Sequence, residues 1–385
     1  MKYLLLGAGL QGSAIAHDLL RHAPQTEKLT IVDHNGELLA NLLDRLADPR
    51  VEGIVCDVTQ NEKLAPLMER VSTVISAVHY WYNFQLSAQA VACRAHFLDL
   101  GGNNDIVAKE LKLHDRASER GTTIIPDCGL APGMASILAY HLHGTFDEVE
   151  NLRIRVGGLP QKPQPPLDYQ LLFAVQGLIN EYIEPCVVIR NGKIETLAGL
   201  TELETVHFPA PFGELEAFQT SGGISTLPVT LQGKVQNLDY KTIRFKGHCE
   251  KFRLLMELGL TSSEPVCFQD KEIAPRDFLG MMLEKRLGFA IEDVALVLIE
   301  AEGYSGGSRV RRSIRVIDYY DSANGISAMA RMTGYPAAIV AWMLAAGEIV
   351  KPGAHPQELA VPAQLFMSEL NRRGIQLRWS EKILI

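Results

Sequence analysis

The sequence predicts an α/β chain with two domains, a doubly wound parallel sheet followed by an α+β domain. From residue 2 to about 128, short apolar runs alternate with amphipathic stretches, a pattern typical of parallel strands joined by helices. Beyond residue 133 glycine and proline become frequent, and the segment 159–169 is too rich in proline to be a simple connection. The length of 385 residues also exceeds what a single core usually organises.

Six strands are expected in the first domain, each a short apolar run bounded by polar or turn-forming residues. Their ranges are 2–6, 29–33, 51–58, 73–78, 96–100 and 122–127. The helical patterns that separate them, long enough for right-handed crossovers, lie at 13–23, 61–71, 83–95 and 105–120. Six strands with helices between them match the strand count of a Rossmann fold.

The second domain mixes strand patterns with helices. Strands are expected at 149–159, 186–197, 238–247, 293–304 and 309–320, and a helix at 169–182. Asn191-Gly192 indicates a hairpin turn. Late helices follow at 326–348, kinked or started afresh at Pro336, and at 362–374, ended by Gly374. We therefore expect a first domain at 1–129, a second at 130–325, and C-terminal helices at 326–385 that pack back on the first domain.

Charge and composition exclude several classes of function. With 37 Lys and Arg against 45 Asp and Glu, the net charge of −8 makes the surface a poor partner for nucleic acid or anionic lipid. The longest late apolar stretch, 337–346, is about half of the ~20 residues that span a bilayer, so we expect no membrane association. The six cysteines show neither Cys-x-x-Cys nor zinc spacing, which indicates reduced thiols and no metal site. The N-terminal apolar run has no cleavage-type site, so a cytoplasmic protein is expected.

A glycine-rich turn at the start of the chain predicts a dinucleotide site. Gly7, Gly9 and Gly12 follow an apolar strand and open a helix, the context in which G-x-G-x-x-G is informative. The first glycine permits the tight turn, the second lets the backbone approach a pyrophosphate, and the third allows close packing of helix on strand. Leu10 and Gln11 lie between the last two glycines, at the helix N-terminus that faces the anion.

Asp33 ends the second strand about 20 residues after the last glycine, where a carboxylate accepts hydrogen bonds from the adenosine ribose hydroxyls. An acid there repels a 2′-phosphate, and no arginine follows at 34–36, so NAD is favoured over NADP. The alternative is a glycine turn with a strand-capping aspartate. Ligands of doubly wound sheets bind beyond the carboxyl ends of the strands. Further cofactor contacts are therefore expected from Asp57, Ser76, Ala77 and Gly101.

Two residues at strand ends are candidates for acid–base chemistry. Asp127 follows the sixth strand, and a carboxylate beside a nicotinamide can hold a substrate ammonium or take a proton from it. Its alternative role is to cap the helix that starts near Pro132. His79 follows the fourth strand and is either a base or a structural hydrogen-bonding residue.

In the second domain, Tyr240, Thr242 and Arg244 alternate along one expected strand and therefore share a face. An arginine there can clamp a carboxylate with two parallel hydrogen bonds, with the Thr and Tyr hydroxyls beside it. An ordinary solvated strand face shows the same residue types. From the residues alone, both interpretations stay open.

These motifs together resemble the saccharopine dehydrogenase-like family and, within it, the lysine 6-dehydrogenases. The segments that carry the resemblance span most of the chain in the same order: 7–19, 74–83, 96–103, 124–134, 156–167, 177–182, 216–228 and 240–248. His79 stands where the family often shows proline, which puts its catalytic role in doubt. The resemblance implies oxidation of the ε-amine of L-lysine by NAD to 2-aminoadipate semialdehyde, which cyclises to Δ1-piperideine-6-carboxylate, with release of ammonia.

The resemblance also implies that Tyr240, Thr242 and Arg244 contact the substrate and that the protein is a homo-oligomer, a dimer or tetramer. We hypothesise that Arg244 anchors the α-carboxylate and that Asp127 manages the amine proton. Hydride leaves only from the carbon beside a neutral amine, and a free lysine amine titrates near ~10.4, so the site must lower this pKa or the enzyme must prefer alkaline conditions. Two alternatives remain: a saccharopine or carboxynorspermidine dehydrogenase acting on a secondary amine, and a non-catalytic NAD-binding regulatory protein.

Overall fold

The computed structural model describes residues 1–289 and 292–384, and the chain divides into two compact units. The first unit consists of Met1–His141, Ile224–Leu227 and Ala330–Leu377. The second consists of Leu142–Gly223, Pro228–Met329 and Arg378–Ile385. The segment predicted as C-terminal helices is therefore divided, since its last residues, from Arg378 onward, belong to the second unit.

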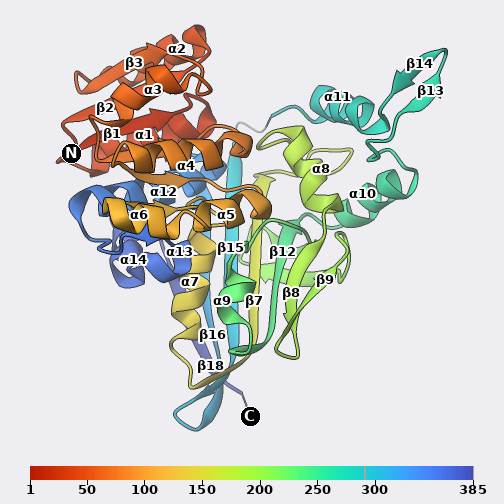
Figure 1. Cartoon of the computed structure of the whole chain (residues 1–385). Coiled ribbons are helices and arrows are strands. Elements are labelled where there is room, and N and C mark those ends of the chain that lie inside the picture. Colours follow the sequence, from red (N-terminus) through yellow and green to blue (C-terminus); the bar gives the residue numbers. More distant parts are fainter. Residues whose placement is uncertain (290–291, 385) are drawn as a thin grey trace. The chain divides into compact units, whose positions relative to one another are not determined.

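A seven-stranded parallel sheet forms the centre of the first unit, in the order β17-β6-β5-β4-β1-β2-β3. Figure 1 labels its strands β1, β2 and β3. Its strands are β1 (Lys2–Leu6), β2 (Lys28–Asp33), β3 (Val51–Val55), β4 (Thr73–Ser76), β5 (His96–Asp99), β6 (Thr123–Ile125) and β17 (Gly353–Ala354). The strand order runs outward from β1 to β3 on one side and from β4 to β6 on the other, which confirms the doubly wound Rossmann fold. Only β17 was not predicted, because two residues are too short to show a pattern.

Helices connect these strands or follow them in the chain. They are α1 (Leu10–His22), α2 (Gly36–Leu46), α3 (Asn61–Met68), the 3₁₀ turn η1 (Tyr80–Tyr82), α4 (Asn83–Ala92), α5 (Asn104–Leu111), α6 (His114–Arg120), α7 (Met134–His143), α12 (Ala328–Ala346), α13 (Gln357–Ala360) and α14 (Ala363–Arg372). The helix predicted at 105–120 is broken into α5 and α6. Helix α12 continues through Pro336, so a second helix does not start there.

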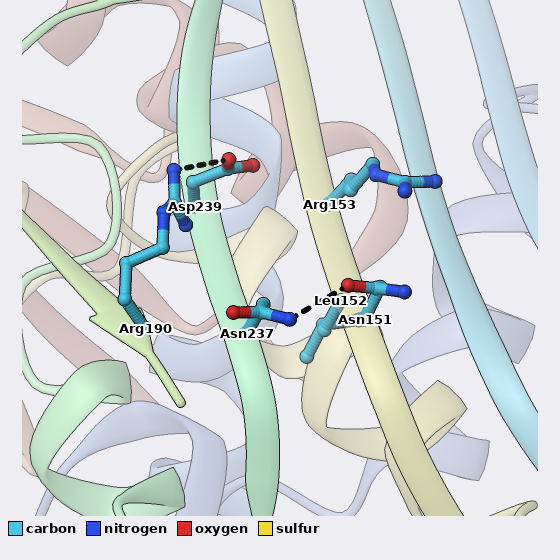
Figure 2. A pocket seen from close by; sticks show the side chains of 6 residues that line it. All are labelled: Asn151, Leu152, Arg153, Arg190, Asn237 and Asp239. Carbon is cyan, nitrogen blue, oxygen red and sulfur yellow. Dashed lines mark hydrogen bonds and ion pairs between the residues drawn. The ribbon is translucent and has the colours of Figure 1, made fainter. Parts of the chain in front are cut away.

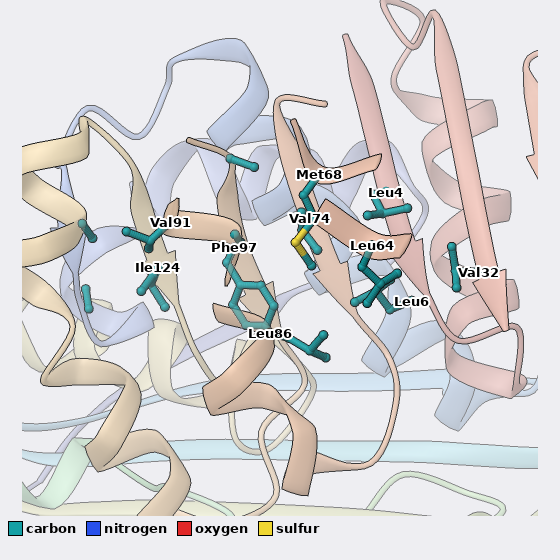
Figure 3. Packing of buried hydrophobic residues seen from close by; sticks show 14 of the residues in the cluster. Leu4, Leu6, Val32, Leu64, Met68, Val74, Leu86, Val91, Phe97 and Ile124 are labelled. Atoms are coloured by element: carbon teal, nitrogen blue, oxygen red, sulfur yellow. The ribbon is translucent and has the colours of Figure 1, made fainter. Parts of the chain in front are cut away.

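The apolar runs that were predicted as strands form the core of this sheet. The side chains of Leu4 and Leu6 on β1 are fully buried and pack in one cluster with Phe97 on β5 (Figure 3). Leu64 on α3 and Leu86 on α4 contribute to the same cluster from the helices. Strands covered on both faces read as continuous apolar runs, which explains why the parallel sheet could be predicted.

A buried ion pair joins α14 to α1 within the first unit. Arg373 donates from Nε to Asp18 Oδ1 at 2.7 Å and from Nη2 to Asp18 Oδ2 at 3.0 Å, and neither side chain is exposed. Glu369, one turn before Arg373, accepts a further hydrogen bond from Nη1. Burial raises the pKa of Asp18 to about 6 although the charge of Arg373 opposes this rise. The pair therefore holds the C-terminal helix to the first helix of the sheet.

Replacing Asp18 by asparagine is expected to lower the free energy of unfolding by about 3 kcal/mol, because the buried guanidinium of Arg373 loses one of its two carboxylate partners and keeps only Glu369. Arg372→Gln is the control, since Arg372 pairs with Glu369 while being 45% exposed, and a change below about 1 kcal/mol is expected for it. Urea denaturation measures the free energy of unfolding of both variants. Equal stability of the two variants would contradict a structural role for the buried pair.

The second unit contains a large mixed sheet with the path β10-β11-β12-β7-β15-β16-β18, to which β8 and β9 attach through β12. Its strands are β7 (Glu148–Pro160), β8 (Cys186–Arg190), β9 (Lys193–Leu197), β10 (Glu204–Phe208), β11 (Gly213–Gln219), β12 (Val235–Arg244), β15 (Asp293–Ser305), β16 (Ser308–Tyr319) and β18 (Arg378–Ile383). The predicted hairpin is confirmed between β8 and β9, where Asn191 and Gly192 have φ of 50° and 76°. Three strands of this sheet were not predicted: β10 and β11, which pair with each other, and β18, which extends the sheet beside β16.

The helices of the second unit lie between residues 175 and 287 and alternate there with strands. They are α8 (Val175–Ile183), α9 (Leu227–Leu231), α10 (His248–Glu257) and α11 (Pro275–Leu287), and a small hairpin is formed by β13 (Val266–Phe268) and β14 (Lys271–Ile273). Tyr182 of α8 and Phe252 of α10 meet Phe218 of β11 in a buried apolar cluster. Among the helices that the structure describes, none is both long and apolar enough to cross a membrane.

Candidate functional site

The glycine-rich turn after β1 leaves space for a ligand at one glycine only. Gly7 adopts φ +104°, and a Cβ there would lie 2.6 Å from the carbonyl oxygen of Ala77. A Cβ at Gly12 would overlap the Gly7 carbonyl. Gly9, the N-cap of α1, has no atom within 4 Å of a Cβ built on it. The two crowded glycines therefore shape the turn, and the open one allows a pyrophosphate to approach.

Helix α1 starts directly at this opening. Leu10 and Gln11 occupy its first turn, and the Leu10 side chain is 60% exposed. The N–H groups of a first helical turn have no carbonyl partner inside the helix and, with the helix dipole, attract an anion. The arrangement fits the phosphates of a dinucleotide.

Asp33, at the end of β2, lies against the glycine turn. Its Oδ2 accepts a hydrogen bond from Ala8 N at 2.7 Å and its Oδ1 accepts one from Asn35 N at 2.8 Å. These bonds hold the carboxylate at the place predicted for the ribose contact.

The substitution Gly9→Ala tests whether the open space at Gly9 is needed to bind the pyrophosphate. Gly9→Ala is expected to keep the melting temperature of the wild type, because Gly9 has φ −68° and free space around it, but to weaken NAD binding about tenfold or more. Gly12→Ala is the matched contrast and is expected to destabilise the fold, because its methyl group overlaps the Gly7 carbonyl. Fluorescence titration and thermal melting measure the two effects. Wild-type NAD affinity in Gly9→Ala would refute the assignment.

The other predicted cofactor contacts lie at the ends of β3, β4 and β5. Ser76 donates from Oγ to Asn83 Oδ1 at 2.7 Å, and Ala77 lies against Gly7. The carboxylate of Asp57 accepts from the Thr59 N–H and hydroxyl, each at 2.8 Å, and these bonds lower the pKa of Asp57. The structure thus brings Ser76 and Ala77 to the glycine turn, while the contacts of Asp57 and Gly101 with the cofactor stay predictions.

Asp127 lies in the loop between β6 and α7. Its backbone adopts φ +63°, which is uncommon for a residue other than glycine, and its side chain is 1% exposed. Neither carboxylate oxygen has a hydrogen-bond partner within the described part of the chain. The alternative role of a helix cap is therefore wrong, because a cap must accept an N–H hydrogen bond. The carboxylate packs directly on Gly101, where a Cβ would overlap it.

The pKa of Asp127 is shifted far from that of a free carboxyl. Burial, and after it the charge of Asp99, raise the pKa of Asp127 to about 8. Ser225 opposes this rise without reaching hydrogen-bonding geometry, and Glu358 adds to it. A buried carboxyl that titrates in the working range of an enzyme is suited to take up and release protons.

Asp99 and Glu110 form a buried carboxyl pair beside Asp127. Asp99 Oδ1 accepts from Gly101 N at 2.6 Å and from Asp127 N at 3.3 Å, so it ties together the loops after β5 and β6. Burial raises the pKa of both acids, and the charge of Asp99 raises that of Glu110 further. Sequence reasoning missed Glu110, although it occupies the buried stripe of α5 with Ile106 and Val107.

His79 is the N-cap of η1. Its Nδ1 accepts from Trp81 N at 3.4 Å, and its ring contacts those of Tyr80 and Trp81. Burial lowers the pKa of His79. These contacts account for a structural hydrogen-bonding role, and a catalytic role for His79 stays a prediction.

In the second unit, Tyr240, Thr242 and Arg244 share one face of β12, and all three are less than 10% exposed. An ordinary solvated strand face is therefore the wrong interpretation. Thr242 Oγ1 forms a hydrogen bond of 2.7 Å with Thr220 Oγ1, and Tyr240 packs over Gly223, where no Cβ would fit. The predicted substrate face is a buried polar cluster.

Arg244 is the centre of this cluster. Its Nε donates to Tyr182 Oη at 2.9 Å and its Nη1 donates to the Ile243 carbonyl at 2.9 Å. The guanidinium lies over the Tyr169 ring, 4.7 Å from its centroid. Of the acids in the described ranges, Glu181 alone forms an ion pair with it, at 4.0 Å from Nη2. The buried positive charge therefore has no carboxylate in direct contact. The sequence analysis did not single out Glu181.

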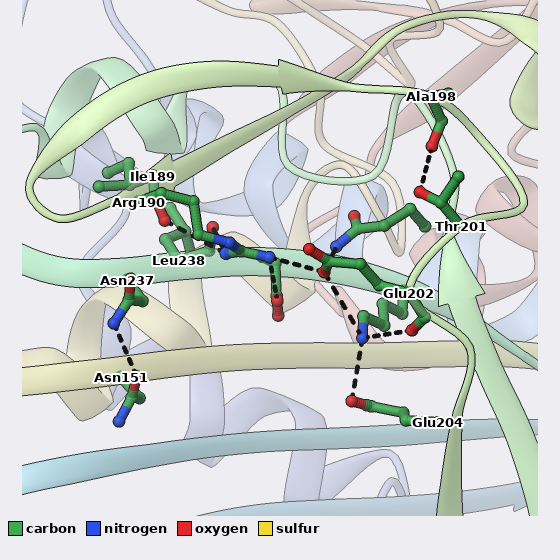
Figure 4. Close-up of polar contacts among 12 residues, drawn as sticks. Asn151, Ile189, Arg190, Ala198, Thr201, Glu202, Glu204, Asn237 and Leu238 are labelled. Atoms are coloured by element: carbon green, nitrogen blue, oxygen red, sulfur yellow. Dashed lines mark hydrogen bonds and ion pairs between the residues drawn. The ribbon is translucent and has the colours of Figure 1, made fainter.

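A polar pocket of ≈ 220 Å³ lies against the opposite face of β12 (Figure 2). Its lining side chains are Asn151, Leu152, Arg153, Arg190, Asn237 and Asp239. Arg190 Nη2 donates to Asp239 Oδ2 at 2.9 Å (Figure 2) and to Glu202 Oε2 at 2.7 Å (Figure 4). Arg190, Asp239 and Glu202 therefore form an ion-pair network on this face.

Two family descriptions match the chain. Residues 3–125 match the saccharopine dehydrogenase NADP binding domain, and residues 129–375 match the saccharopine dehydrogenase C-terminal domain. The mitochondrial alpha-aminoadipic semialdehyde synthase of Bos taurus is 24% identical over 431 residues, covering 91% of this chain and 45% of that protein. The chain thus spans about half the length of the first curated relatives. The saccharopine dehydrogenase [NADP(+), L-glutamate-forming] of Pyricularia oryzae is 20% identical, covering 86% of this chain and 88% of that protein.

Solved structures share the fold. Apo saccharopine dehydrogenase (L-Glu forming) from Saccharomyces cerevisiae superimposes with a TM-score of 0.79 at 19% identity over 100% of both chains. Homospermidine synthase from Legionella pneumophila, solved in complex with NAD, gives a TM-score of 0.71 at 11% identity over 99% of this chain and 91% of that one. At such identities the likeness extends to the fold alone.

Proposed function

The chain belongs to the saccharopine dehydrogenase family, and on that premise we propose that it oxidises the ε-amine of L-lysine with NAD. The products are 2-aminoadipate semialdehyde, which cyclises to Δ1-piperideine-6-carboxylate, and ammonia. The observation that carries the proposal is the burial of Arg244. This cation shares its strand face with the hydroxyl groups of Tyr240 and Thr242 and has no carboxylate in direct contact. Such a group is suited to bind the α-carboxylate of an amino acid.

NAD is the proposed cofactor, although the matched family domain is described as NADP binding. The open Gly9 and the first turn of α1 would hold the pyrophosphate, and Asp33 would accept from the ribose hydroxyls. A 2′-phosphate would meet the Asp33 carboxylate without an arginine at 34–36 to neutralise it. When bound, the nicotinamide supplies the hydride acceptor.

Asp127 is the proposed acid–base group for the amine. The ε-ammonium of lysine must lose a proton before hydride can leave the adjacent carbon, because only a neutral nitrogen can share its lone pair. A carboxylate with a pKa raised to about 8 is a stronger base than an ordinary aspartate and can receive that proton. Water then adds to the oxidised carbon, and ammonia departs.

Saccharopine, a secondary amine, is the alternative substrate, and the names of the relatives favour it. Saccharopine carries three carboxylates, whereas lysine carries one. Burial lowers the pKa of His248, a neighbour of Arg244, to about 3 and keeps that ring neutral, so His248 adds no second cation beside Arg244. A neutral His248 supports the smaller substrate, which carries one carboxylate.

One assay separates the candidates. The protein is incubated with NAD and either L-lysine or saccharopine, and NADH, ammonia and glutamate are quantified. The proposal predicts NADH and ammonia in equal amounts from lysine alone, without a keto acid. NADH and glutamate from saccharopine only would establish the secondary-amine reaction instead. Tight NAD binding with oxidation of neither amine would identify a non-catalytic NAD-binding protein.

A further inference from the structure

Glu181 lies on the last turn of α8 and faces Arg244. Its Oε2 is 4.0 Å from Arg244 Nη2, beyond hydrogen-bonding distance but within range of strong attraction. Its backbone carbonyl accepts from Ser221 N at 2.8 Å, which fixes the end of the helix at this place. Two opposite charges therefore lie close together without closing into a direct contact.

The two charges differ in their access to water. The Arg244 side chain is 3% exposed, whereas that of Glu181 is 35% exposed. Burial nevertheless raises the pKa of Glu181 to about 7, an effect that Arg244 opposes and Glu184 increases. Because the Glu181 carboxylate is partly desolvated, a cationic group that binds beside it from solvent would stabilise its ionised form.

The orientation of Arg244 is set by its neighbours. Tyr169 and Tyr182 lie 4.7 and 5.8 Å from the guanidinium carbon, measured to their ring centroids. Because Tyr182 Oη and the Ile243 carbonyl take the Nε and Nη1 hydrogens, the Nη2 end is directed toward Glu181. The guanidinium thus presents its Nη2 edge to the Glu181 carboxylate.

We propose that Glu181 and Arg244 together bind the zwitterionic head of an α-amino acid, with Glu181 accepting from the α-ammonium and Arg244 donating to the α-carboxylate. An α-amino acid carries these two charges on one carbon, so its head matches a cation and an anion that face each other across a short gap. The inference rests on the proposed function for the amine substrate. It adds a specificity rule: the site selects amines that carry an intact α-amino acid group.

Substrates that lack one charge test this pairing. 6-Aminohexanoate retains the carboxylate and the reacting amine of lysine but has no α-amino group. Glu181→Gln is expected to raise KM for L-lysine about tenfold or more while kcat changes less than about threefold, and to leave KM for 6-aminohexanoate unchanged. Glu184→Gln removes a neighbouring exposed charge from the same helix end and is expected to change neither value.

Calorimetric titration makes the test independent of turnover. Wild-type protein should bind L-lysine more tightly than 6-aminohexanoate, and Glu181→Gln should abolish that preference while retaining the wild-type melting temperature. Equal weakening of both ligands would show that Glu181 only balances the charge of Arg244, and a large fall in kcat would place it at the reacting amine; each outcome overturns the inference. If lysine binds with the predicted preference but is not oxidised, the proposed function fails and this inference stands. If wild-type protein binds neither ligand, both fail.

Discussion

Replacing Asp127 by asparagine is expected to lower kcat for lysine oxidation about 10²–10⁴-fold, with little change in KM or in NAD affinity. The substitution keeps the size of the side chain but removes the group that receives the amine proton. Steady-state kinetics with NAD and lysine measure the effect. A variant within threefold of the wild type in kcat would show that Asp127 does not handle the proton.

The pH dependence provides an internal control for this variant. The pKa of Asp127 is raised to about 8, so wild-type kcat/KM should increase as pH rises through that value, when the carboxylate forms. In Asp127→Asn the pH at which kcat/KM increases should move toward ~10.4, the pKa of a free lysine amine.

Stability should change in the opposite direction to activity. A carboxyl whose folded pKa lies above its unfolded value is favoured in its neutral form by the native state, so the wild type loses stability as pH rises from the ordinary carboxyl value of 3.8 to about 8. Asparagine has no such loss. Asp127→Asn should therefore melt above the wild type at pH 9 and close to it at pH 4.

Replacing Arg244 by methionine is expected to lower kcat/KM for lysine about 100-fold, mainly through KM, because the α-carboxylate loses its charged donor. 1,5-Diaminopentane, which has no carboxylate, should be used equally poorly by the wild type and the variant. Arg244→Lys should recover only part of the loss, since an ammonium cannot reproduce the planar fork.

Lys251 offers the matched control for this substitution. It is 44% exposed and pairs with Asp168 at 2.7 Å, at the start of the helix that follows Arg244 in the chain. Lys251→Met should leave KM for lysine within about twofold. If Arg244→Met also left KM for lysine unchanged, the α-carboxylate would have to bind elsewhere.

The cofactor turn could be predicted because its chemistry depends on local backbone geometry. Glycine is the residue that permits φ +104° at Gly7 and the close approach at Gly12. The spacing of the glycines in the sequence therefore predicts both features of the turn. The parallel strands were legible for a related reason, since a strand buried on both faces must be apolar throughout. Strands β17 and β18 were missed because their pairing depends on distant segments, and β18 is exposed along its length.

Two acidic residues near the candidate sites could not be predicted in the same way. Glu110 and Glu181 are ordinary helix residues in sequence, and only the tertiary structure turns the first toward Asp99 and the second toward Arg244. For Arg244 the strand alternation identified the correct face but not its burial, which comes from the rings of Tyr169 and Tyr182. Periodicity shows which residues share a face, whereas packing decides whether that face is dry.

A crystal structure of the protein with NAD and L-lysine bound would locate both ligands directly. We expect the pyrophosphate over Gly9, the adenosine ribose on Asp33, and the lysine α-carboxylate on the Arg244 guanidinium. A lysine carboxylate held by other groups, or a dinucleotide bound away from the glycine turn, would contradict this expectation.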